Sequence, residues 1–147
     1  MIWKSLDKYR DVGLLVARLG FGLGFLYYHG WGKLIGGPER WANVGGAMSH
    51  VGIDFGHTFF GFLAGLSESL GGLLIAAGLF FRPVCALLAF TMFMATLSHY
   101  VTGNGNPAHA FKNLFVLVGL VLIGPGKYSL DAVLQRRAAP SDSPPPS

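Results

Sequence analysis

The chain has 147 residues, of which 52% are hydrophobic and only 12% are charged, and its mean hydropathy is +0.49. Since a soluble domain carries about a quarter charged residues, this composition argues against a soluble protein and indicates a membrane protein. The formal net charge is +4, but the basic residues stand at the ends of apolar segments rather than in one patch, which argues against a nucleic-acid-binding surface.

Four apolar segments approach the length of about 20 residues that a membrane-spanning helix needs. They cover residues 12–30, 58–81, 83–102 and 108–124, and the last is the shortest. Arg82-Pro83 separates the second from the third, because proline favours the first position of a new helix, and the "GNGNP" at 103–107 predicts a turn before the fourth. The sequence therefore predicts an all-α fold, an integral membrane bundle of four transmembrane helices within residues 1–134.

Residues 31–57 form the long connection between the first two spans. After Pro38, four apolar residues recur at helical spacing: Trp41, Val44, Met48 and Val51. This spacing favours a short amphipathic helix lying at the membrane interface, whereas the Gly45-Gly46 pair favours an irregular loop equally well. The last segment, 135–147, reads "QRRAAPSDSPPPS" from residue 135, which is typical of a disordered Pro/Ser-rich tail.

The orientation follows from the Lys and Arg residues in the short flanks of the spans. With four spans, three basic flanks share one side: Lys4, Lys8, Arg10, Arg82, Lys127, Arg136 and Arg137. That side is predicted to be cytoplasmic, so that both termini are cytoplasmic. The long connection, with Lys33 and Arg40, then lies outside.

Two charged residues stand deep inside the first two predicted spans. Glu68 lies about halfway through the very apolar stretch at 61–81, and Arg18 lies several residues inside the first span. At about 1.5 Å per residue their depths are comparable, and each alone costs several kcal/mol in the membrane interior. We therefore expect a bidentate Arg18–Glu68 pair. Such a pair either marks a functional site or only fixes the register of the two helices.

On this topology the histidines all fall on the outer side. A polar pocket formed by His29, Lys33, His99 and Lys112 is expected there, above the Arg18–Glu68 layer, and it suits a quinone head, an anion or a metal. Imidazole suits zinc, copper or iron, but no two histidines show the His-x-x-x-His spacing of a helical metal site. The weaker metal candidates are His50, His57 and His109. The alternative is that all these residues only pack at the membrane interface.

Three stretches in this order resemble the DoxX family of small four-helix bacterial membrane proteins: "RLGFGLGFLYYHGWGKL" (18–34), "ESLGGLLIAAGLFFRP" (68–83) and "GPGKYSLD" (124–131). The resemblance covers about residues 10–134 and implies a place in the bacterial inner membrane. Relatives include the small subunit of a thiosulfate:quinone oxidoreductase. The family pattern carries over, with no catalytic role, to Arg18, Gly30, Lys33, Glu68, Gly72, Arg82 and the segment 124–131. A related branch is linked to disulfide chemistry, which does not suit a chain with the single cysteine Cys85.

The resemblance and the expected pocket favour a redox-associated subunit in the lipid bilayer that binds a quinone or a small anion beside a partner oxidoreductase. The sequence has no haem-binding Cys-x-x-Cys-His, no iron–sulfur cysteines and no glycine-rich nucleotide loop, so no electron carrier and no catalytic residue is assigned. The alternatives are a non-enzymatic scaffold or a metal-handling protein. A small transporter fits less well, because the chain shows neither repeats nor broken helices.

Overall fold

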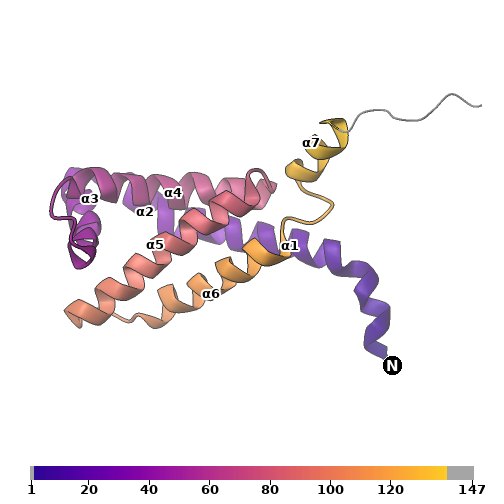
Figure 1. The fold of residues 1–147 in the computed structure, drawn as a ribbon, viewed down its shortest axis with the longest axis horizontal. Coiled ribbons are helices and arrows are strands. Elements are labelled where there is room, and N and C mark those ends of the chain that lie inside the picture. The colour runs from indigo at the N-terminus through magenta and orange to yellow at the C-terminus, as the bar shows by residue number, and fades with distance from the viewer. Residues whose placement is uncertain (1, 139–147) are drawn as a thin grey trace, which may run out of the picture.

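The computed structural model describes residues 2–138, with side chains from Leu6 onward, and this part of the chain is all-helical (Figure 1). The predicted all-α class is therefore confirmed. The first helical segment changes its winding three times: a 3-10 stretch, Ile2–Tyr9, leads into α1, Arg10–Gly24, then a π-helical turn, Phe25–Gly30, and α2, Trp31–Leu34.

The remaining helices follow with short connections. They are α3, Gly37–Gly45, which continues into a 3-10 turn, Gly46–Val51; α4, His57–Ala77; α5, Phe81–Thr102; α6, Ala108–Ile123; and α7, Leu130–Ala138. In Figure 1, α1, α4, α5 and α6 run along the length of the molecule. The short helices α2 and α3 lie at one end, and α7 and the N-terminus lie at the other.

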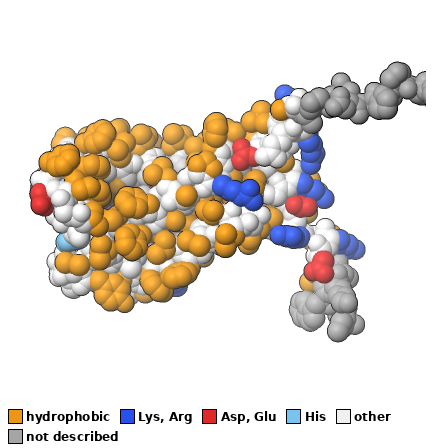
Figure 2. All heavy atoms as spheres, in the orientation of Figure 1, with side chains coloured by type: hydrophobic (Ala, Val, Ile, Leu, Met, Phe, Trp, Pro, Cys, Tyr) orange, Lys and Arg blue, Asp and Glu red, His pale blue; other side chains and the backbone are white. Residues whose placement is uncertain are grey.

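Three helical segments are long and apolar enough to cross a membrane: Leu6–Leu34, His57–Ala77 and Phe81–Thr102. The fourth predicted span, α6, is a shorter apolar helix of 16 residues. A membrane bundle therefore fits the structure, while a fourth crossing by α6 stays a prediction. Exposed hydrophobic side chains cover the body of the molecule, and most of the visible Lys and Arg side chains gather at the end that carries α7 and the N-terminus (Figure 2).

The boundary between the second and third spans lies earlier than predicted. α4 ends at Ala77 rather than at residue 81, because Gly78 and Phe80 adopt left-handed backbone conformations, with φ of 69° and 46°, that reverse the chain. A glycine in this conformation is the usual end of a helix. Pro83 then falls within the first turn of α5, where its missing N–H costs nothing. The turn predicted after the third span is confirmed, since α5 ends before Gly103.

The helix predicted in the long connection is confirmed as α3, and the irregular loop is excluded for these residues. Gly45 is the last residue of α3 and lies at a close approach to α4. A Cβ at this position would overlap the backbone of His57. On the other side of the contact, a Cβ at Gly61 would overlap the backbone of Trp41. The location of α3 at a membrane interface remains a prediction.

Glycine also sets the contact between α1 and α4, as in membrane bundles generally. A Cβ at Gly22 would overlap the carbonyl oxygen of Gly72, and a Cβ at Gly72 would overlap that of Gly22. At the C-terminal end, the first four residues of the expected tail, 135–138, are helical, because they continue α7. The rest of the predicted tail, 139–147, lies outside the described residues.

A candidate ligand cavity between α3, α4 and α5

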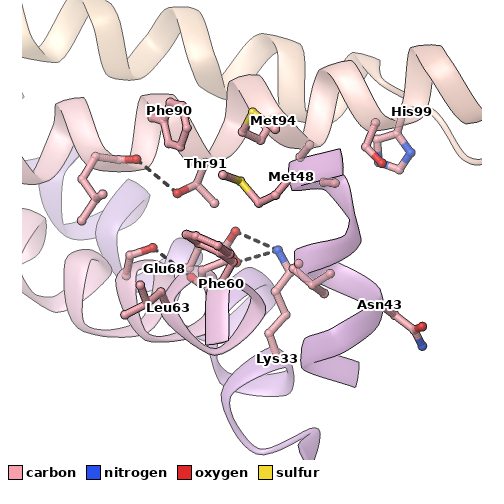
Figure 3. A pocket seen from close by; sticks show the side chains of 18 residues that line it. Lys33, Asn43, Met48, Phe60, Leu63, Glu68, Phe90, Thr91, Met94 and His99 are labelled. Carbon is pink, nitrogen blue, oxygen red and sulfur yellow. Dashed lines mark hydrogen bonds and ion pairs between the residues drawn. The ribbon is translucent and has the colours of Figure 1, made fainter. Parts of the chain in front are cut away.

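A cavity of about 480 Å³ lies between α4, α5 and the segment formed by α3 and the following 3-10 turn (Figure 3). Most of its lining is apolar. The larger side chains that form its walls are Met48, Phe60, Leu63, Phe90 and Met94. These residues come from three separate elements, so the cavity exists only because α3 folds back against α4.

The polar feature of this cavity is an ion pair between Lys33 and Glu68. The Nζ atom of Lys33 donates to both carboxylate oxygens of Glu68 at 2.7 Å. The Glu68 side chain is fully buried, and that of Lys33 is 22% exposed. Figure 3 shows the ammonium group of Lys33 reaching across to the carboxylate. The glutamate in the middle of the second apolar segment therefore has a partner, but not the predicted one.

The predicted Arg18–Glu68 pair is wrong. The guanidinium group of Arg18 lies against Gly78 and Ser129, and Gly78 is ten residues beyond Glu68 along the chain, roughly 15 Å at the rise of an α-helix. The Nη2 atom of Arg18 instead donates to the carbonyl oxygen of Tyr128 at 3.1 Å. Arg18 thus lies at the end of the bundle where α4 ends and α7 begins, far from the cavity.

Lys33 reaches Glu68 because the first helix does not end at residue 30, as predicted, but continues to Leu34. Two glycines allow this part of the helix to approach α4 closely: a Cβ at Gly30 would overlap Ser69, and a Cβ at Gly65 would crowd the backbone of Lys33 and Leu34. The indole Nε1 of Trp41 in α3 donates to the carbonyl oxygen of Lys33 at 2.8 Å. α3 therefore holds the lysine backbone in place from the other side.

Three other polar side chains of the lining bond to the protein, whereas Asn43 and Ser98 make no side-chain hydrogen bond to another described residue. Ser67 donates to the carbonyl oxygen of Ala64, and Thr91 donates to that of Leu87. His99 also lines the cavity, but its Nδ1 bonds to the carbonyl oxygen of Asn104 at 2.6 Å, and Figure 3 shows it well apart from Lys33. The Lys33–Glu68 pair is consequently the strongest polar feature that a ligand would meet.

Exposed apolar side chains stand among the lining residues on α4 and α5. Leu63, Leu87 and Phe90 are 39%, 52% and 51% exposed. They lie within the two helices that are long and apolar enough to cross a membrane. In a bilayer these side chains would contact lipid tails, so the cavity would open toward the hydrocarbon.

The structure brings together only part of the predicted outer pocket. Lys33 and His99 line the cavity, whereas His29 lies against α6 and Lys112 is exposed on α6. Glu68, expected at the bottom of that pocket, is in the cavity wall, and Arg18 is not.

The histidines do not form one cluster. His29 and His109 bond to each other through their Nε2 atoms at 3.1 Å, and His57 bonds to the hydroxyl of Ser49. Within residues 2–138, no group of three or more His, Cys, Asp or Glu side chains is placed to hold a metal ion. Cys85 is fully buried in the apolar core.

Sequence reasoning missed the apolar part of the site. The thioether groups of Met48 and Met94 and the ring of Phe60 form the cavity walls, but in the sequence they look like ordinary core or lipid-facing residues. Lys33 was the one signal at hand, because a lysine that directly follows a membrane span can reach back along it.

The chain is similar to known proteins over most of its length. The DoxX family model matches residues 13–101. The chain is also 34% identical over 137 residues to the Inner membrane protein YqjF of Escherichia coli (strain K12), in a match that covers 90% of this chain and 99% of the relative. No solved structure matches it. The relative's name and the three long apolar helices together support a location in the bacterial inner membrane.

Proposed function

The chain belongs to the DoxX family, and from this premise we propose that it binds a quinone-class molecule in the cavity between α3, α4 and α5, beside a partner oxidoreductase. The observation that carries the proposal is the combination of an apolar cavity with one buried Lys33–Glu68 pair. Binding sites for small molecules are typically apolar cavities of about 300–1,000 Å³ with few polar groups that fix the orientation. The cavity volume of about 480 Å³ falls in this range.

The charge of the pair distinguishes a quinone from a small anion. Because the Lys33 ammonium is neutralised by Glu68, an anion in the cavity would lose its water without meeting a net positive charge. An ammonium group has three donors, and two of them point to the carboxylate oxygens of Glu68. The third suits the carbonyl oxygen of a quinone, and the carboxylate suits the hydroxyl group of the reduced quinol.

The exposed apolar lining residues also favour a ligand that dissolves in the bilayer. Leu63, Leu87 and Phe90 would border an entrance from the lipid tails, through which a ligand enters without crossing water. The electrons for a quinone would have to come from a partner enzyme, which is why the proposal includes an oxidoreductase subunit.

Binding of decylubiquinone to the full-length protein in lipid nanodiscs tests the proposal, with tryptophan fluorescence quenching as the readout. The variant Ala95→Phe fills the cavity, since Ala95 is in its lining. Val118→Phe adds the same ring to the exposed face of α6, where Val118 is 44% exposed, and serves as the matched control. We expect the Kd for decylubiquinone to rise at least about tenfold in Ala95→Phe and to stay unchanged in Val118→Phe.

Thiosulfate serves as the anionic probe in the same nanodiscs, with calorimetry as the readout. We expect no binding of thiosulfate. If thiosulfate binds and decylubiquinone does not, the anion alternative replaces the quinone. If the two phenylalanine variants bind decylubiquinone equally, or neither probe binds the wild type, the scaffold alternative stands.

We also propose that the shorter helix α6 crosses the membrane together with the three long helical segments, and that both termini are cytoplasmic. The ends of the described chain lie at one end of the molecule, together with most of the visible basic side chains, which supports this orientation under the positive-inside rule. The variant Asn104→Cys, in the exposed turn after α5, should react with an impermeant maleimide from outside in intact cells. The fully buried Cys85 of the parent protein should not react. Labelling only after the membrane is opened would reverse the orientation.

A further inference from the structure

Outside the lining of the cavity, two histidines from different helical segments meet. His29 is in the π-helical turn Phe25–Gly30, and His109 is in the first turn of α6. Their Nε2 atoms lie 3.1 Å apart and their ring planes differ by only 17°. We propose that this pair is a binding site for a divalent transition-metal ion that prefers imidazole, Cu²⁺ or Zn²⁺.

The distance between the nitrogens fits a shared metal ion. Metal–nitrogen bonds to histidine are about 2.0–2.1 Å long, so two Nε2 atoms 3.1 Å apart subtend an angle of about 100° at an ion between them. This angle lies between that of a square-planar and that of a tetrahedral ion, the geometries of Cu²⁺ and Zn²⁺. The rings need to turn only so far that both in-plane lone pairs converge on the ion.

Without an ion, the pair can hold a single hydrogen between the two nitrogens. A neutral imidazole carries its proton on one of its two nitrogens, so one Nε2 donates and the other accepts. A metal ion takes the place of this shared hydrogen and is held by both lone pairs. The one shared proton moves to the Nδ1 atom of its own ring, and the other ring already carries its proton there. A cation therefore suits the two facing nitrogens electronically as well as in distance.

The surroundings hold one ring and leave the other accessible. His29 is half-buried and its ring stacks on that of Phe25, with the centroids 4.9 Å apart. His109 is exposed on the surface of α6, so an ion can reach the pair, and this ring is free to turn. Lys33, the third residue of α2, is neutralised by Glu68. This pairing limits the repulsion between the Lys33 ammonium and a bound metal ion.

Two protein ligands leave the remaining positions of the ion to water or to another molecule. Described residues offer no third His, Cys, Asp or Glu at this point. Structural metal sites usually have four protein ligands. An ion held by only two protein ligands would therefore exchange readily with the solution. For a site with two imidazoles, the order of divalent-ion affinities predicts that Cu²⁺ binds more tightly than Zn²⁺.

Metal titration of the full-length protein tests the proposal, in detergent and in a buffer that does not bind metals, with a purification tag that contains no histidine. Glycine as a competing chelator sets the affinity scale, and the electron paramagnetic resonance of Cu²⁺ reports its nitrogen ligands. We expect one equivalent of Cu²⁺ with the signature of two imidazole nitrogens. The Kd should rise at least about tenfold in His29→Gln and in His109→Gln.

His50→Gln is the matched control, because His50 lies in the 3-10 turn Gly46–Val51 and is not part of the pair. It should keep the wild-type Kd and spectrum. Should His29→Gln fail to fold, the exposed His109→Gln still decides the question. Equal Kd values in wild type and His109→Gln, or a spectrum that His50→Gln alters and His109→Gln does not, would overturn the proposal. Since decylubiquinone binding is measured at a different cavity, either proposal can fail without the other.

Discussion

Two buried charged groups lie in this bundle, and their surroundings differ. Near the end that carries α2 and α3, Glu68 and Lys33 form an ion pair in the wall of a cavity. Near the opposite end, Arg18 is 1% exposed and has one hydrogen bond, to the carbonyl oxygen of Tyr128, while its Nε and Nη1 atoms have no partner among the described residues. One charge is in direct contact with an opposite charge. The other bonds to a main-chain carbonyl and interacts with the carboxylate of Asp131 only through space, without a direct ion pair among the described residues.

The end of the bundle that carries Arg18 has a network of hydrogen bonds to main-chain groups. Asp131, at the start of α7, accepts hydrogen bonds from the N–H groups of Phe80 and Phe81, and its own N–H donates to the carbonyl oxygen of Gly78. This network ties the segment after α6 to the turn between α4 and α5, with the Arg18 guanidinium enclosed behind Gly78. The ion pair thus lines a cavity, whereas the arginine belongs to a closed contact between helices.

The largest effect is expected from breaking the ion pair. In Glu68→Gln the Lys33 ammonium loses its counter-charge, and removing one partner of a buried pair costs about 3–5 kcal/mol. Lys33→Met should cost a similar amount, because it leaves the fully buried Glu68 carboxylate alone. The double variant should lose less than the sum of the two. Unfolding free energies in mixed detergent micelles measure all three, and simple additivity would show that the two groups are not coupled.

The second-largest loss of stability is expected at the contact of Gly78 with Arg18. Gly78→Ala forces an alanine into a backbone with φ of 69° and places its Cβ against the Arg18 guanidinium and Ser129. The backbone strain costs about 1 kcal/mol and the overlap about 1–3 kcal/mol more. Gly103→Ala is the matched control, since Gly103 has φ of 65° but no atom within 4 Å of the new Cβ. Equal losses of unfolding free energy in the two variants would mean that the Arg18 side chain moves aside at little energetic cost.

Arg18→Met should cost less than Glu68→Gln, and this difference is the most direct test of the comparison. The methionine loses the hydrogen bond to Tyr128, but it also removes two buried nitrogens that lack partners in the described chain. We expect a loss of about 1–2 kcal/mol, the contribution of one hydrogen bond from a charged group. If Arg18→Met destabilises the bundle as much as Glu68→Gln, the guanidinium has a charged partner in the membrane-embedded protein.

The smallest effect is expected for Asp131→Asn. The amide nitrogen of asparagine cannot accept the second of the two N–H groups at the start of α5, which now bond to the two Asp131 oxygens at 2.9 Å each. Loss of such a cap costs about 1 kcal/mol. Asp54→Asn, at an exposed position in the loop before α4, should leave the thermal stability unchanged. A Tm of Asp131→Asn equal to that of Asp54→Asn would show that the cap contributes nothing.

The sequence predicted the elements well where composition decides them. The length of the apolar segments predicts the long helices. Pro38 and the helical spacing of the apolar residues after it predict α3. The boundary after α4 was misplaced because Phe80 lies in the left-handed region, which bulky residues rarely adopt. No local pattern reveals that Asp131, 51 residues away, binds the N–H of Phe80.

The partner of Glu68 was misjudged for a related reason. The predicted depth of each residue depends on the ends of the predicted spans, and the first helical segment ends at Leu34, about one turn later than the predicted residue 30. Lys33 was therefore placed in a loop, although its side chain reaches into the bundle. The cavity itself could not be predicted, because its walls come from α3, α4 and α5. The spacing of these helices depends on long-range contacts, such as those of Gly45 and Gly61 between α3 and α4 and that of Gly71 with α5.

The π-helical turn Phe25–Gly30 holds one residue more than a turn of regular α-helix would. It therefore absorbs an extra residue without changing the orientation of the helix on either side. A one-residue deletion that closes this turn to regular α-helix should leave Lys33 facing Glu68. The same deletion in α1, after Arg18, would rotate Arg18 relative to Lys33 by about 100° and separate one of them from its partner. Single deletions in the first helical segment should therefore be tolerated in this turn and not in the part of α1 that follows Arg18.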